Sequence, residues 1–389
     1  MPQFVQSVAN QQTPPPYHFP GVRVHAFIID MPMDAVQSYC DTYFNLGDAK
    51  QRGFVYRPLA VSPFAVLMVI EYPMMINSNR AQLGYDEIPF ADRGYSSQNE
   101  VFLAFPVLRH GLTLRNLFMD AAVEWAMPFI AVNNSTSAFS GREILGLEKL
   151  WAEIDLGTGI YPNGFSARVA IPAWSSLNPN VQQQMLPVVM IDTGTPLPSV
   201  GRASDLTSPW TTLQSPAALK TFEFLSGAMD GLCTFSNGII PSPMHLVALK
   251  QFRDAEDPHR AIYQALVGAR TRYYDVSELQ LYNEQDVTIM LNSGGSFGEI
   301  ARLFARGAAG PLVATDPSQG DQPLNLIAKA AFTFRANLDF DEMRTLHTFP
   351  VDGGGAVPED LTTPGDLLSP WLVPWQGFFG VGTSGGSQT

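Results

Sequence analysis

The chain contains only two cysteines, Cys40 and Cys233, among its 389 residues. They lie far apart and form no CxxC pair, so the sequence predicts neither a disulfide framework nor a cysteine metal site. The six histidines show no metal-ligand spacing, and no metal or organic cofactor is implied. Because the amino terminus also lacks the basic start and apolar core of a signal peptide, we expect a protein of the reducing cytoplasm.

Positive charge is scarce as well. Lysine and arginine together number 23, against 36 aspartates and glutamates, which gives a net charge of −13 without any basic run. This balance excludes nucleic acid and an anionic membrane surface as expected partners. The longest apolar run, 64–76, is interrupted by Glu71 and Pro73 and is too short to span a bilayer. An anionic substrate would therefore need a local cation inside its pocket.

Glycine, proline and aromatic residues are abundant, with 32 glycines, 31 prolines and 11% aromatics. This composition favours short strands separated by turns, and no regular helix alternates with the strands. We therefore predict a β-rich α+β fold with an antiparallel or barrel-like sheet and a few short helices. The predicted strands are 22–31, 64–72, 100–107, 128–133, 151–156, 165–171, 245–252, 261–276, 286–291 and 330–338, with helices at 35–44, around 216–225 and at 296–305.

The sequence predicts one domain with three additions. Residues 1–16, which end in TPPP, look like a flexible arm, and the ordered domain spans 17–350. A change to Ser, Pro, Thr and Gly indicates an insertion at about 172–243. The tail, 351–389, is rich in Gly and Pro but carries aromatic residues, so we expect it to dock on its own domain or on a neighbouring subunit.

One of the five lysines lies in an apolar setting, within the stretch SGREILGLEKLWAEIDL at 140–156. GREILGLEKL resembles the signature of the acetoacetate decarboxylase family, in which Gly-Arg-Glu is followed after two residues by Gly or Ala, and one residue later by Pro-Lys-Lys. The first lysine of that pair is the family's Schiff-base nucleophile. The residues in register are Gly141, Arg142, Glu143 and Gly146, with Lys149 at the position of the nucleophile.

Further segments agree with this register. The stretch 16–36 is similar to the family's first segment and places its active-site arginine at Arg23, and 95–107 places a catalytic glutamate at Glu100. The stretches 246–271 and 323–338 resemble a later hairpin and the last strand. The resemblance implies a closed antiparallel barrel or cone and a homo-oligomer.

The resemblance also implies a mechanism. A lysine amine has a pKa of about 10.4 in water, so its neighbourhood must favour the neutral form before the nitrogen can attack a ketone. Lys149 would then form an iminium, an electron sink that lets a neighbouring carboxylate leave as carbon dioxide. Arg23 would orient that carboxylate and supply positive charge, while Glu100 would hold Arg23 or relay a proton. Glu71, near the end of an apolar strand, is a secondary candidate for the cavity.

Other residues of the motif would support this chemistry. Leu150 and Trp151 are predicted to form part of an apolar wall that contacts the substrate, and Gly141, Arg142 and Glu143 are predicted to position the loop. This sequence departs from the family's Pro-Lys-Lys at two positions. Leu150 replaces the second lysine, and Glu148 replaces the proline.

These departures leave three functions open. The first is decarboxylation of a β-keto acid longer or more apolar than acetoacetate. The second is another Schiff-base reaction of a keto acid, such as aldol condensation, aldol cleavage or dehydration. The third is non-catalytic binding of a small acid. Taken alone, Lys149 reads as a surface charge, Arg23 as a strand-edge residue and Glu100 as a polar strand start.

Overall fold

The computed structural model describes residues 13–59, 64–77, 94–112, 122–159, 163–175, 179–198, 244–292 and 323–350. Among these residues, none of the helices has the length and apolar character that crossing a bilayer requires. The predicted helices around 216–225 and at 296–305, and the aromatic tail at 351–389, lie outside the described residues, as do residues 1–12 of the predicted arm.

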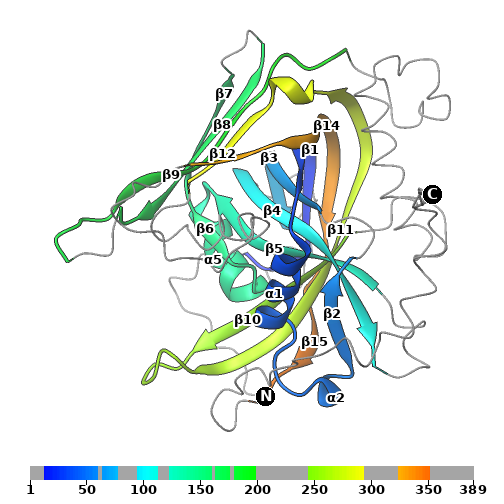
Figure 1. Ribbon diagram of the computed structural model, residues 1–389, viewed down its shortest axis with the longest axis vertical. Coiled ribbons are helices and arrows are strands. Elements are labelled where there is room, and N and C mark those ends of the chain that lie inside the picture. The colour runs from blue at the N-terminus through cyan, green and yellow to red at the C-terminus, as the bar shows by residue number, and fades with distance from the viewer. Residues whose placement is uncertain are drawn as a thin grey trace, which may run out of the picture.

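Strands make up most of the described chain, and the helices are short, as the composition predicted (Figure 1). The strands are β1 (Tyr17–Asp30), β2 (Phe54–Pro58), β3 (Phe64–Asn77), β4 (Ser96–Gly111), β5 (Ala122–Val132), β6 (Lys149–Trp151), β7 (Glu153–Thr158), β8 (Phe165–Ala173), β9 (Gln184–Asp192), β10 (Met244–Arg253), β11 (Ala261–Leu281), β12 (Thr288–Leu291), β13 (Leu324–Leu326), β14 (Ala328–Phe340) and β15 (Arg344–Thr348). The helices and helical turns are α1 (Met33–Tyr43), α2 (Ala49–Arg52), α5 (Ser135–Ser140), η2 (Gly141–Leu145) and η5 (Glu284–Asp286).

The larger sheet has the strand order β2-β4-β3-β1-β14-β11-β10-β5-β6, and β15 pairs with β11. Because β4 also pairs with β5, the strand pairings from β4 through β1, β11 and β10 return to their starting point. Most pairs are antiparallel, as predicted, but β5 runs parallel to both β10 and β6. The β-rich fold class is confirmed, with a mixed sheet in place of a purely antiparallel one.

A smaller sheet has the order β13-β12-β9-β8-β7, and its strands β7, β8 and β9 lie at the upper left of Figure 1. Strand β9 pairs with β8 on one side and with β12 on the other. The predicted insertion at 172–243 therefore includes a strand from the interior of this sheet. The remainder of that stretch from residue 199 onward lies outside the described residues.

Strand β1 contributes to two separate hydrophobic cores. Its residues Val22, Val24, Ala26 and Ile28 pack into one core, together with residues of η2. Its residues Phe27 and Ile29 pack into the other, together with residues of α1, β8 and β9. This division follows from the alternation of side chains along a strand. We call the first the cavity-side core and the second the helix-side core.

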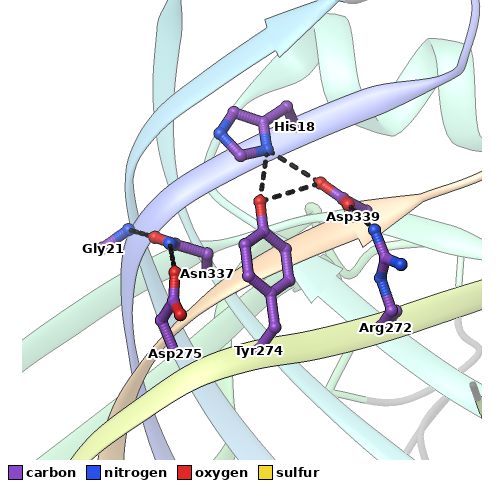
Figure 2. A network of polar contacts seen from close by, with 7 residues as sticks. All are labelled: His18, Gly21, Arg272, Tyr274, Asp275, Asn337 and Asp339. Atoms are coloured by element: carbon purple, nitrogen blue, oxygen red, sulfur yellow. Dashed lines mark hydrogen bonds and ion pairs between the residues drawn. The ribbon is translucent and has the colours of Figure 1, made fainter. Parts of the chain in front are cut away.

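A polar network joins the start of β1, the middle of β11 and the end of β14 (Figure 2). His18 Nδ1 lies 2.8 Å from Asp339 Oδ1, and Arg272 Nη2 donates a hydrogen bond of 2.8 Å to Asp339 Oδ2. The hydroxyl of Tyr274 lies 3.2 Å from the same nitrogen of His18. Burial alone would raise the pKa of Asp339, but the hydrogen bonds with His18 and Arg272 lower it. The network ties together three strands whose neighbouring residues line the cavity described next.

Candidate active site

Lys149 follows a helix, a turn and a short loop. Helix α5 continues into η2, and the chain then reverses at Gly146, whose φ of 72° is left-handed. Leu147 N donates to Gly141 O over 2.9 Å, which closes the turn. Strand β6 begins at Lys149, which is in register with Ile130 of the parallel strand β5. The turn after η2 and the pairing of β6 with β5 thus hold Lys149 in the last strand of the larger sheet.

Gly141 makes room for the lysine side chain. A Cβ atom at this position would lie 2.4 Å from Lys149 Cδ and 2.8 Å from Lys149 Cγ, much closer than carbon atoms approach. The glycine of the Gly-Arg-Glu motif therefore has a steric role in this protein, because the aliphatic part of Lys149 crosses directly over its backbone.

The amine of Lys149 forms an ion pair inside the protein. Lys149 Nζ donates to Glu100 Oε2 of β4 over 2.7 Å and to Ser137 Oγ of α5 over 3.2 Å. Lys149 and Glu100 are only 8% and 5% exposed. Since a buried ion pair is retained only with close geometry and further hydrogen bonds, these groups form a coherent polar centre. The structure therefore brings two of the three predicted catalytic residues together.

Further polar groups surround Glu100. Gln98 Nε2 donates to Glu100 Oε2 over 3.3 Å. Burial, and then the nearby carboxylate of Glu100, raise the pKa of both Tyr72 and Tyr273. Both phenols consequently remain protonated at neutral pH and keep their capacity to donate hydrogen bonds.

Lys149 lies in the wall of a cavity of about 60 Å³. A single water needs roughly 10–15 Å³ by this measure, so the space suits a substrate of a few heavy atoms. Among the described residues that line the cavity, Lys149 is the only lysine or arginine. Most of the wall is apolar or aromatic, including Phe19, Met75, Phe102, Met127, Leu145 and Leu147.

Arg23 and Glu71 lie on the other face of the same sheet. In β1, Arg23 stands between Val22 and Val24, which belong to the cavity-side core, so its side chain points the opposite way. Arg23 Nη2 lies 3.6 Å from Glu278 Oε2, and the arginine side chain is 40% exposed. Neither Arg23 nor Glu71 is among the residues that line the cavity. The expected meeting of Arg23 with Lys149 and Glu100 is thus absent from the described structure.

Glu71 instead faces His25, whose side chain lies on the same face of β1 as Phe27 of the helix-side core. Glu71 Oε1 lies 3.7 Å from His25 Nε2, and His25 Nδ1 lies 2.8 Å from the hydroxyl of Tyr282. The ring of His25 stacks on Phe165 at a centroid distance of 3.7 Å. Burial lowers the pKa of His25, and the hydrogen bond to His25 lowers the pKa of Glu71.

The apolar residues after the lysine are also directed away from the cavity. Leu150 packs against the helix-side core, and Trp151 is 44% exposed. The substrate contacts predicted for Leu150 and Trp151 are therefore not seen. Because adjacent residues in a strand point to opposite faces, Leu150 and Lys149 cannot both face the cavity. The second lysine of the family motif, which Leu150 replaces, has no counterpart in this wall.

The remaining residues of the motif lie beside the site. Arg142 Nη1 donates to the backbone oxygen of Lys149 over 3.4 Å, which agrees with a role in positioning the loop. Arg142, Glu143 and Glu148 are exposed and line a second hollow of about 830 Å³. Glu148 therefore does not compete with Glu100 for the amine of Lys149.

The sequence did not single out Gln98 or Ser137, whose side chains contact Glu100 and Lys149. Gln98 precedes Glu100 by two residues in one strand, so the period of a strand places both on one face. Ser137 precedes Gly141 by four residues, which is one helical turn. Among the described residues, no group of three or more His, Cys, Asp and Glu side chains is placed to hold a metal ion.

No protein-family model matches the sequence, and no curated protein matches it. Solved structures do resemble the fold. Acetoacetate decarboxylase from Legionella pneumophila subsp. pneumophila str. Philadelphia 1 has 10% identity and a TM-score of 0.49, over 90% of this chain and 92% of that one.

The enduracididine biosynthesis enzyme MppR, complexed with the condensation product of pyruvate and imidazole 4-carboxaldehyde, has 14% identity and a TM-score of 0.45, over 87% and 92% of the two chains. An acetoacetate decarboxylase-like enzyme from Sphingomonas wittichii RW1 has 10% identity and a TM-score of 0.44, over 88% and 98%. The structural neighbours of this chain thus include acetoacetate decarboxylase and an acetoacetate decarboxylase-like enzyme. Identities of 10–14% mean that this similarity concerns the fold alone.

Proposed function

We propose that this protein is an enzyme of the lyase type that forms a Schiff base between Lys149 and a small carbonyl substrate. One observation carries the proposal. The amine of Lys149 lies in the wall of an apolar cavity and donates a hydrogen bond of 2.7 Å to the buried carboxylate of Glu100. The apolar cavity gives a carbonyl compound access to the amine, and Glu100 is placed to take the proton that the amine must lose before it attacks.

Glu100 acts as the acid and base of this reaction. It accepts the proton that Lys149 must lose before its nitrogen has a lone pair, and the nitrogen then attacks the carbonyl carbon. Glu100 returns the proton to the oxygen of the carbinolamine, which leaves as water and gives the iminium. Ser137 Oγ, which lies 3.2 Å from Lys149 Nζ, holds the nitrogen in place and is a second polar contact for the departing oxygen.

Decarboxylation of a β-keto acid is the first reaction proposed for this iminium. The bond to the carboxylate carbon breaks, its electron pair passes into the carbon–nitrogen system as an enamine, and carbon dioxide leaves. Protonation of the enamine carbon and hydrolysis then release the ketone and the lysine. The apolar wall supports this reaction, because a carboxylate is poorly solvated there and carbon dioxide is uncharged.

Aldol cleavage or dehydration is the second candidate, and the placement of Arg23 favours it. The arginine expected to bind a carboxylate lies on the opposite face of β1, and Lys149 is the only lysine or arginine among the described residues lining the cavity. An uncharged carbonyl substrate needs no second cation. Non-catalytic binding, the third function the sequence left open, would use the same cavity without a covalent bond.

The test is reductive trapping with cyanoborohydride, peptide mass spectrometry and a parallel assay for carbon dioxide. The panel contains acetoacetate, pyruvate and simple methyl ketones. We expect a reduced adduct on the peptide that contains Lys149, its loss in Lys149→Met and its retention in the control variant Lys329→Met. Lys329 is a suitable control because its amine pairs with Asp30 and its side chain is 54% exposed. Carbon dioxide release identifies decarboxylation, and an adduct-free protein that still binds these compounds refutes the Schiff-base proposal.

A further inference from the structure

Four residues immediately before β1 lie against the cavity that contains Lys149. Residues 13–16 have the sequence TPPP, and we call them the N-terminal strap. Thr13 is among the residues that line the cavity, and Pro15 is buried. The strap therefore belongs to the wall of the candidate active site, although it precedes the first residue of the sheet.

Hydrogen bonds hold the strap on two sides. Thr13 N donates to Ser140 Oγ over 2.8 Å, and Ser140 is a buried residue at the end of α5. The hydroxyl of Tyr17, the first residue of β1, donates to Thr13 O. Asn77 Nδ2, at the end of β3, donates to Pro14 O. The strap thus connects α5 with the ends of two strands of the larger sheet.

The cavity lies at the same end of these strands. Tyr17 is in register with both Asn77 and Phe340, so β1 begins where β3 and β14 end. Thr271 of β11 is opposite Phe340. Three of these four residues, Tyr17, Thr271 and Phe340, line the cavity. Since the strap adjoins Tyr17 and extends to α5, it lies across this end of the cavity.

A wall that is held in this way limits the size of the occupant. The cavity of about 60 Å³ has space for a few heavy atoms. In an open apolar cavity each additional methylene of a ligand favours binding, because more apolar surface leaves water. A methylene that meets a fixed wall is instead overpacked and disfavoured. The length of the substrate is therefore the property on which the strap acts.

We propose that the N-terminal strap determines substrate size. While Thr13 N donates to Ser140 Oγ, only short carbonyl compounds fit beside Lys149, and loss of this hydrogen bond admits longer ones. The proposal rests on the proposed function of Lys149 and names the size class of its substrate. Ser140 directly precedes Gly141, over whose backbone the side chain of Lys149 passes, so the strap is anchored next to the reacting lysine.

The experiment compares two methyl ketones of different length. 2-Butanone and 2-octanone present the same carbonyl end and differ only in their alkyl chains. The second-order rate of cyanoborohydride trapping at Lys149 is measured for each ketone below saturation and divided by the rate for a free lysine derivative. For the wild-type protein we expect this ratio to be about tenfold higher or more for 2-butanone, because the longer chain meets the strap.

Variants of the strap and its anchor test whether the strap causes the preference. Ser140→Ala removes the acceptor of the hydrogen bond, and Thr13→Pro removes the donor, because proline has no backbone N–H. Each should lower the preference for 2-butanone about fivefold, the effect of one ordinary hydrogen bond. In the double variant Thr13→Pro/Ser140→Ala the preference should fall no further, since both changes remove one bond. Ser135→Ala, the same substitution at an exposed position of α5, is the matched control and should keep the wild-type preference.

The outcomes separate this proposal from the function on which it rests. Trapping of 2-octanone as fast as 2-butanone by the wild-type protein overturns the size limit and leaves the Schiff base standing. A wild-type preference in Ser140→Ala and Thr13→Pro overturns the role of the strap, even if the trapping of both ketones slows. The two variants remove the same bond from different residues, so the test stays decisive if one of them does not fold.

The choice of ketones does not limit the test. If keto acids are trapped at Lys149 and ketones are not, acetoacetate and 3-oxooctanoate replace the two ketones, with the same expected preference for the shorter compound. If no ketone or keto acid forms an adduct at Lys149, the proposed function and the size limit both fail.

Discussion

Glu100 and Glu71 lie on opposite faces of the same pair of strands. In the register of β3 and β4, Glu100 is opposite Ile70, whereas Glu71 is opposite Asn99. Ile70 belongs to the cavity-side core, so Glu100 reaches Lys149 while Glu71 reaches His25. Of two carboxylates that the sequence offered, only one is in the candidate active site.

The first prediction concerns the stability of the Lys149–Glu100 ion pair. In Lys149→Met the carboxylate of Glu100 remains buried without its partner, so the free energy of unfolding should fall by about 3–5 kcal/mol. In the double variant Lys149→Met/Glu100→Gln no charge is left unpaired, and much of this loss should be recovered. Urea denaturation at pH 7 measures both. Additive losses in the double variant would show that the two groups do not interact.

The second prediction concerns Gly141. An alanine Cβ would lie 2.4 Å from Lys149 Cδ, so Gly141→Ala must displace the lysine side chain. We expect loss of adduct formation at Lys149 and destabilisation by about 1–3 kcal/mol, as for overpacking in a core. Gly157→Ala is the matched control, since its Cβ would meet Ser166 Oγ at an acceptable 3.4 Å. Trapping by Gly141→Ala at the wild-type rate would contradict the observed path of the side chain.

The third prediction separates Arg23 from Glu100. Because Arg23 lies on the opposite face from the cavity, Arg23→Gln should change the rate of adduct formation at Lys149 less than twofold. Glu100→Gln removes the proton acceptor and should lower that rate by about 10²–10⁴-fold. Trapping rates with one ketone at saturating concentration provide the comparison. A loss of similar size in both variants would restore the catalytic role that the sequence suggested for Arg23.

The fourth prediction concerns the pH dependence of stability through His25. Burial holds the pKa of this histidine in the folded protein below its usual 6.5. Between the folded pKa and 6.5 the unfolded chain binds more protons, so the protein loses stability as the pH falls below 6.5. His25→Gln should make this dependence shallower by up to about 1.4 kcal/mol per pH unit.

Urea denaturation between pH 7.5 and 5.5 tests this slope, with His259→Gln at an exposed position as the control. A part of the slope should remain in His25→Gln, because burial also lowers the pKa of His110, His245 and His347. The readout is the slope and not the absolute stability, since His25 also stacks on Phe165. An unchanged slope would show that His25 is not buried in its neutral form.

Much of the secondary structure followed from local patterns. The predicted strands 22–31, 64–72, 100–107, 165–171, 245–252, 261–276 and 330–338 correspond to β1, β3, β4, β8, β10, β11 and β14, and the helix predicted at 35–44 overlaps α1. The Gly-Arg-Glu motif singled out Lys149, and the structure supplies the steric reason for its glycine. These features depend on residues close together in the chain, so the sequence could indicate them. The parallel pairings of β5 and the position of β9 inside the smaller sheet depend on strands distant in sequence. No local pattern predicted either feature.

Which residues meet in the candidate site was decided by tertiary structure. The sequence by itself determined that Arg23 and Val24 point to opposite faces of β1, because side chains alternate along a strand. It did not determine which face borders the cavity, since both faces of this strand pack against apolar cores. An irregularity between Phe19 and Val22 also shifts the register within β1. Only the assembled sheets decided that Glu100, Gln98 and Ser137 surround Lys149 and that Arg23 does not, because one residue of register exchanges the two faces.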